Sequence, residues 1–182
     1  MSKLLAIDPG NVYTGYVIMD ENYKPLQHGK VLNEDMLNII RVYSVLNKNV
    51  VIEMVASYMM NVGRTVFDTC IFIGKIEQLC EQEGLSYTTI ERRYVKLNLT
   101  GKVTATDSII SDALVNRFSY ENPRNHGKGT KKEPGFFYGF AKDVWAAYAL
   151  GVTQLDINEG TFKIEPKNDG KNKKKRRKLN EK

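Results

Sequence analysis

Residues 3–19 read KLLAIDPGNVYTGYVIM, and this stretch decides the fold. A short apolar run over 3–7 ends at Asp8-Pro9-Gly10, and a run rich in β-branched and aromatic residues follows over 12–19. Two such runs separated by Pro and Gly predict two strands joined by a tight connection. A third strand is predicted over 25–32, so the chain opens as a three-stranded antiparallel meander.

Helix and strand patterns alternate after this meander. In chain order we expect a helix from a capping Asn33 to Leu46, a buried strand over 49–54, a long helix over 61–83, a strand over 85–90, a helix that follows a capping box at 104–107 and ends at Phe118, and a last helix over 140–152. This order predicts an α/β fold in which a mixed sheet is flanked by helices.

Two of these helices carry apolar residues at spacings of three and four. The buried side of the first is expected to hold Met36, Leu37, Ile40, Val45 and Leu46, and that of the long helix Val62, Val66, Cys70, Ile73, Ile76 and Cys80. Gly84 suits the end of the long helix. Gly63 and Gly74 inside it are costly unless another backbone comes close to them.

The positive charge of the 182-residue chain is concentrated at its C-terminal end. The chain has 27 basic and 21 acidic residues. Nine of the basic and two of the acidic residues lie in 166–182, so 18 basic and 19 acidic residues remain in 1–165. A segment so poor in apolar residues is typical of a disordered arm that binds polyanions, or of a solubilising terminus or nuclear-localisation signal. We therefore expect one domain over 1–158 and a basic disordered tail over 159–182.

Cysteine and histidine usage argues against a disulfide-linked protein and against a zinc-binding protein. Cys70 and Cys80 lie ten residues apart in the predicted helix, roughly 15 Å at 1.5 Å per residue, too far for a disulfide. We expect both to be buried small apolar residues. With only His28 and His126 there is no zinc-ligand set. No signal peptide or membrane span is recognisable, so the sequence predicts a cytoplasmic protein.

Three carboxylates stand in apolar surroundings. Asp8 ends the first strand, Glu53 ends the fourth, and Asp143 lies in the last helix. If the first and fourth strands are neighbours, Asp8 and Glu53 emerge at one edge of the sheet, and a helix across that edge can bring Asp143 to them. Grouped carboxylates repel unless a hard cation such as Mg²⁺ neutralises them. Taken singly, each acid has the alternative of a strand-end or helix-surface position, but their joint placement favours a metal site.

Four segments, in order, resemble the RuvC family of Holliday junction resolvases. They are AIDPG at 6–10 with TGY at 14–16, VIE at 51–53 with Asn61 and the helix after it, VKLNLTG at 95–101, and KDVWAAYAL at 142–150. The resemblance covers about residues 3–152. It implies an RNase H-like fold, a homodimer, and cleavage of four-way DNA junctions with two Mg²⁺ or Mn²⁺ ions per active site. The basic tail and divergent helices look like a bacteriophage-encoded member, which would act in the host cytoplasm.

The resemblance also implies roles for individual residues. Asp8, Glu53 and Asp143 would be metal ligands, and Lys96 would contact the scissile phosphate or assist charge stabilisation. The helix over 61–83 would form the dimer contact. Tyr58 is a candidate for stacking on a base at the junction centre, with a packed core tyrosine as the alternative.

Two departures from the family pattern bear on activity. Ala146 stands where the fourth carboxylate is expected, three residues after Asp143, so that DxxD has become DxxA. The chain is therefore either an engineered inactive variant or a natural protein with weakened catalysis. Asp107 stands where the family commonly has a second lysine. If Asp107 instead serves the capping box, Lys102 would take the phosphate role.

The predicted function is structure-selective cleavage of Holliday junctions and other branched DNA. The alternatives are a protein that binds branched DNA without cutting it, or an RNase H-like nuclease with another nucleic-acid substrate. The residues expected to contact DNA are Tyr58, Arg64, Arg92, Arg93, Lys96, Lys102, Arg124, Lys128, Lys131 and Lys132. Recognition would be of shape and phosphates rather than of bases.

Overall fold

A single five-stranded mixed sheet runs through the computed structural model, which describes residues 2–56 and 63–164. Its strands are β1 (Lys3–Pro9), β2 (Tyr13–Asp20), β3 (Pro25–Leu32), β4 (Asn49–Met54) and β5 (Ser86–Glu91). The spatial order is β3-β2-β1-β4-β5, antiparallel from β3 to β1 and parallel from β1 to β5. The predicted meander and the mixed sheet are confirmed.

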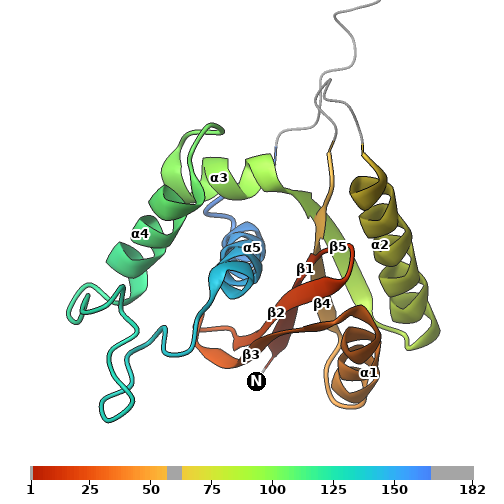
Figure 1. Ribbon diagram of the computed structural model, residues 1–182, viewed down its shortest axis with the longest axis horizontal. Coiled ribbons are helices and arrows are strands. Elements are labelled where there is room, and N and C mark those ends of the chain that lie inside the picture. The colour runs from red at the N-terminus through yellow and green to blue at the C-terminus, as the bar shows by residue number, and fades with distance from the viewer. Residues whose placement is uncertain (1, 57–62, 165–182) are drawn as a thin grey trace, which may run out of the picture.

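Helices cover both faces of this sheet (Figure 1). They are α1 (Asn33–Ser44), α2 (Arg64–Gln82), α3 (Arg92–Thr100), α4 (Asp107–Phe118) and α5 (Lys142–Glu159). α1 and α2 pack on one face, and α3, α4 and α5 lie on the other. In the described part of the chain, no helix is long and apolar enough to cross a membrane.

Strand β1 lies at the centre of both apolar layers. Successive side chains of a strand point to opposite faces, and accordingly Leu4 and Ala6 join the α5 side of the core while Leu5 and Ile7 join the α1 and α2 side. All four are buried. The uninterrupted apolar run of the sequence is therefore what a strand buried on both faces requires.

Several local expectations are corrected by the structure. The N-cap of α1 is Leu32, not Asn33, because the Asn33 side chain bonds to neighbouring loop and strand atoms instead. Val45 and Leu46 follow the end of α1 and are 75% and 86% exposed. Cys70 is exposed on α2, whereas Cys80 is buried, and both thiols are free.

The segments after β5 also differ from the sequence-based expectation. Residues 92–100 form a helix that the sequence did not indicate, since only Val95 in it is buried. Thr106, not Thr104, caps α4, and its hydroxyl accepts a hydrogen bond from the Ile109 amide at 3.4 Å. Asp107 is thus the first residue of the helix. The last helix continues past the expected end at Val152 to Glu159.

Candidate active site at the ends of β1 and β4

The two strand-end carboxylates lie side by side because of the sheet register. β1 and β4 are adjacent and parallel, with Ile7 paired to Ile52, so Asp8 and Glu53 follow at equivalent positions. Asp8 and Glu53 were expected to emerge at one edge of the sheet if their strands were neighbours, and the strands are neighbours. Across the other side of β1, Asp8 pairs with Gly15 of β2.

Gly15 explains how the third carboxylate reaches this edge. A Cβ atom at Gly15 would lie 2.5 Å from the backbone oxygen of Asp143 and 2.9 Å from its Cβ. No larger residue fits, so glycine is required for the first turn of α5 to rest on β2. Because Gly15 is paired with Asp8, this contact brings Asp143 to the end of β1.

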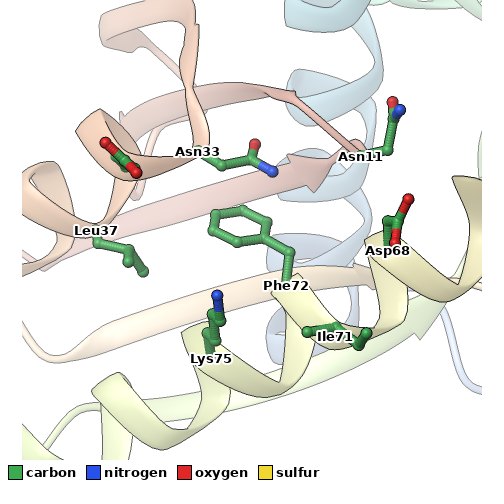
Figure 2. Close-up of a pocket in the computed structure, with 8 residues that line it drawn as sticks. Asn11, Asn33, Leu37, Asp68, Ile71, Phe72 and Lys75 are labelled. Carbon is green, nitrogen blue, oxygen red and sulfur yellow. The ribbon is translucent and has the colours of Figure 1, made fainter.

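Asn33 braces the turn that follows β1, a role that the sequence did not suggest. Its side-chain amide donates to the Gly10 carbonyl at 3.1 Å, and its Oδ1 accepts from the Thr14 hydroxyl at 2.8 Å. Thr14 is fully buried. A hollow of about 340 Å³ lies beside this turn, where Asp68, Phe72 and Lys75 of α2 face Asn11 and Asn33 (Figure 2).

Two side-chain cations pair with the carboxylates. Lys30 Nζ lies 2.7 Å from Asp143 Oδ2. The Arg92 guanidinium bridges two acids, with one terminal nitrogen 3.1 Å from Glu53 Oε2 and the other 2.8 Å from Asp107 Oδ1. Arg92 was a candidate for DNA contact, and the structure places it within the acidic group instead of on an open surface.

The site nevertheless remains short of positive charge. Burial, and then the neighbouring charge of Glu53, raise the pKa of Asp8 to about 8. Burial also raises the pKa of Glu53, although Arg92 and, to a lesser extent, Lys96 oppose that rise. A carboxylate whose ionised form is disfavoured in this way gains from an added cation.

The donor chemistry fits a hard divalent cation, because Asp8, Glu53 and Asp143 are oxygen ligands with excess negative charge. In this structure Glu53 is paired with the Arg92 guanidinium and Asp143 with the Lys30 ammonium group. Within residues 2–56 and 63–164, no three His, Cys, Asp or Glu side chains are grouped closely enough to hold one ion together.

A fourth carboxylate reaches this site from an unexpected element. The sequence offers no acid near Ala146 on α5, but Asp107 at the start of α4 is joined to Glu53 through Arg92. The hydrogen bond from Arg92 lowers the pKa of Asp107, and Lys96 and Lys142 act in the same direction. This cross-link could not be read from local patterns, because its partners are 15 and 39 residues apart.

The other candidates for DNA contact lie on several different elements. Lys96 lies on α3, and its charge acts on both Glu53 and Asp107. Arg93 pairs with Glu91 at 3.0 Å and stacks on Tyr94. Arg64, Lys102, Arg124, Lys131 and Lys132 are exposed, whereas Lys128 is half-buried. Tyr58 and the basic segment 166–182 lie outside the described residues.

Comparison with known proteins identifies the fold. Neither a protein-family model nor a curated protein sequence matches the chain. Among solved structures, Thermus thermophilus RuvC matches with a TM-score of 0.59 and 15% identity, covering 87% of this chain and 97% of RuvC. T. thermophilus RuvC in complex with a Holliday junction substrate matches with a TM-score of 0.60 and 15% identity, covering 88% and 98%. The chain therefore has the RNase H-like fold of RuvC.

Proposed function

We propose that this protein is a metal-dependent endonuclease that acts as a homodimer on branched DNA, and on four-way junctions in particular. The observation that carries the proposal is that three acids far apart in the sequence lie at the same end of the sheet. Asp8 and Glu53 end adjacent parallel strands, and Gly15 lets Asp143 rest beside them. The fold that the chain shares with RuvC, which was solved in complex with a Holliday junction substrate, supports the proposal.

Asp8, Glu53 and Asp143 would hold Mg²⁺ or Mn²⁺, two ions per site in the active form. Such ions supply an activated water and stabilise the leaving oxygen of a phosphodiester. The chain's own residues would then exchange partners, with Arg92 leaving Glu53 and Lys30 leaving Asp143. Arg92 stays tied to Asp107, so its freed donors, together with Lys96, are placed to bind the phosphate.

The dimer would form through α2. Phe67 and Ile71 are 59% and 61% exposed, and Cys70 and Gly74 continue the same stripe at helical spacing. A Cβ atom at Gly63 or Gly74 would meet nothing within 4 Å among the residues that the structure describes. The close backbone that would account for these glycines is therefore proposed to come from a second copy, and two active sites related by a two-fold axis suit a two-fold symmetric junction.

Nicking of a synthetic four-way junction tests the proposal. The wild-type chain should nick the junction with Mg²⁺ or Mn²⁺ and not with EDTA, and Asp8→Asn should lower the rate by about a hundredfold or more. Asp35→Asn, which changes an exposed acid on α1, is the matched control and should leave the rate unchanged. Metal-dependent nicking that survives Asp8→Asn would refute the assignment of the site.

A second function is favoured by one observation, the alanine at position 146. A site with one carboxylate fewer could retain junction binding without cleavage. Binding to the junction in a gel-shift assay, with no nicking under any metal condition, would establish this alternative. Competition between the junction and an RNA–DNA hybrid tests the remaining alternative, a nuclease that prefers another substrate.

A further inference from the structure

A second concave site opens beside the acidic group, at Asp107. It has a volume of about 400 Å³ and lies between the start of α4, the loop over 119–141 and the start of α5. Its walls include Trp145 and Lys142 of α5, Ser111 of α4, and Asn125, His126 and Lys128 of the loop. Asp107, which Arg92 links to Glu53, stands at its border. We call this concave site the Trp145 hollow.

One wall of the Trp145 hollow is aromatic and fixed in place. The ring of Trp145 lies 4.6 Å from that of Phe137 and 5.1 Å from that of Phe140, measured between centroids. Phe137 and Phe140 are buried. Their packing holds the half-buried indole in one position, with its remaining surface toward the hollow. A flat aromatic surface of this kind is a platform for a nucleobase, whatever its identity.

The facing walls supply positive charge and hydrogen-bond donors. Lys128 and Lys142 come from different elements, and neither forms an ion pair with any residue in the described ranges. His126 Nδ1 lies 3.5 Å from Asp112 Oδ1. The Asn125 amide and the Ser111 hydroxyl add polar groups. Two ammonium groups without an ion-pair partner in the described ranges, next to an aromatic surface, are suited to a ligand that is both anionic and planar.

The loop that carries these groups is rigidly built. Asn125 and His126 both have left-handed backbones, with φ of 51° and 53°, which few residues other than glycine adopt. Gly127 follows with φ of 68°, and a Cβ atom there would lie 2.6 Å from the Ser119 hydroxyl. The Gly127 carbonyl accepts a hydrogen bond from the Phe137 amide at 3.0 Å. Strained backbone held in this way is typical of preformed binding sites.

We propose that the Trp145 hollow binds one unstacked nucleotide of a DNA strand, with the base against Trp145 and the phosphate between Lys128 and Lys142. Its volume lies within the usual range for small-ligand sites, about 300–1,000 Å³. The identity of the strand as DNA rests on the proposed function. Bound there, a nucleotide would lie next to the proposed scissile phosphate and hold it in register with the carboxylates.

Intrinsic fluorescence tests this directly, because Trp145 is the chain's only tryptophan. In EDTA, so that no cleavage occurs, the full chain is titrated with the oligonucleotide (dT)4, with thymidine 5′-monophosphate, and with inorganic phosphate. We expect saturable quenching by (dT)4, weaker binding of the mononucleotide, and no quenching by phosphate. Equal affinity for the mononucleotide and for (dT)4 would contradict a strand site, and quenching by phosphate alone would reduce the hollow to an anion site.

Matched lysine variants separate the hollow from general electrostatic attraction. Lys128→Ala should weaken (dT)4 binding about tenfold, the loss expected for one charge-assisted hydrogen bond. Lys24→Ala removes an exposed charge from the β2–β3 turn, which does not line the hollow, and should change the affinity less than twofold. Equal effects of the two variants would overturn the proposal.

The outcome is independent of the nicking assay. Lys128-dependent quenching without metal-dependent nicking would leave the hollow standing and remove the proposed endonuclease. Nicking without quenching would support the proposed endonuclease and exclude the Trp145 hollow as a nucleotide site.

Discussion

Ala146 and Asp107 together define how the acidic site departs from a four-carboxylate arrangement. Ala146 lies one helical turn after Asp143 on α5, where a carboxylate would face the same side. Asp107 instead supplies the fourth carboxylate, from the start of α4 and through Arg92. The two positions are not equivalent, because the Asp107 carboxylate is anchored by a guanidinium and 62% exposed, whereas residue 146 is half-buried.

Restoring the acid should therefore increase activity. We expect Ala146→Asp to raise the single-turnover nicking rate by about tenfold or more, because it adds an oxygen ligand beside Asp143. Mn²⁺ affinity, measured by calorimetry, should rise in parallel. Asn158→Asp adds the same charge at the opposite, exposed end of α5 and should change neither quantity. If Ala146→Asp gave no gain in nicking, the missing ligand would not be what limits this site.

At the scale of the elements, α2 presents an apolar stripe that nothing in the described chain covers. Phe67 and Ile71 lie one turn apart and are more than half exposed, although both are large apolar residues. Exposed apolar groups at helical spacing, beside glycines with open space above them, are typical of a helix–helix contact.

A charge in this stripe should separate the dimer. We expect Phe67→Glu to convert a dimer to a monomer in analytical ultracentrifugation, because two like charges would face each other across the two-fold axis. Nicking of the two junction strands by isolated monomers should become uncoupled, so that the strands are cut in separate events. Val42→Glu places the same change on α1, where Val42 is 76% exposed, and should leave the dimer intact. A wild-type chain that sediments as a monomer would exclude the proposed contact.

The elements also show which features a sequence can predict. The strands β1, β2 and β4 follow from local apolar runs, and with them the positions of Asp8 and Glu53. Helix α3 does not, since it buries only Val95 and ends at Gly101, whose φ is 69°. The pairing of Lys30 with Asp143, and of Arg92 with two acids, depends on contacts between distant segments, so no local pattern indicates it.

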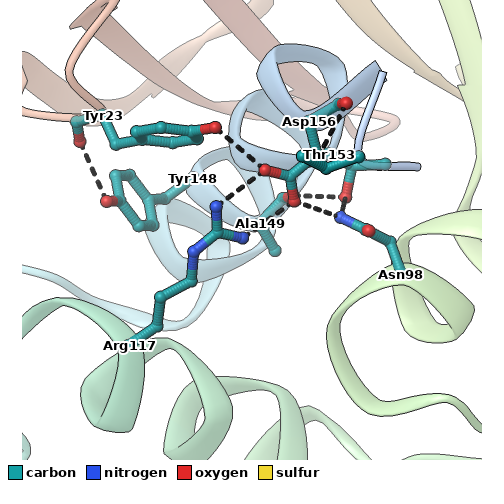
Figure 3. A network of polar contacts seen from close by, with 8 residues as sticks. Tyr23, Asn98, Arg117, Tyr148, Ala149, Thr153 and Asp156 are labelled. Carbon is teal, nitrogen blue, oxygen red and sulfur yellow. Dashed lines mark hydrogen bonds and ion pairs between the residues drawn. The ribbon is translucent and has the colours of Figure 1, made fainter. Parts of the chain in front are cut away.

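At the scale of the whole molecule, one buried acid connects four separate segments (Figure 3). Asp156 of α5 is 2% exposed. It accepts hydrogen bonds from the Tyr23 hydroxyl, the Asn98 amide and both terminal nitrogens of Arg117, over distances of 2.7 to 3.0 Å. The end of α5 is thereby tied to the β2–β3 turn, to α3 and to α4. Burial opposes ionisation of Asp156, but Arg117 and Asn98 outweigh it and lower its pKa.

Removing this charge should destabilise the protein. We expect Asp156→Asn to lower the free energy of unfolding by about 2 kcal/mol at pH 7, because Arg117 loses its paired acceptor. A pKa lower in the folded than in the unfolded chain stabilises above the unfolded value, and that contribution is lost as the pH falls through the folded value. The variant should therefore lose less stability on acidification than the wild type, as measured by urea denaturation. Asp112→Asn, at an exposed acid of α4, should have little effect; equal stability of the two variants would contradict the role of Asp156.

Asp143 and Asp156 sit near opposite ends of the same helix, thirteen residues or roughly 20 Å apart. Because α5 is a continuous helix packed against a dense, weakly compressible core, a shift or tilt at one of its ends also displaces the other end. The hydrogen bonds of Asp156 therefore help to fix the position of α5 and, with it, that of Asp143. Weakening them would displace Asp143 and lower the affinity of the proposed site for metal ions, although none of the bonding residues belongs to that site.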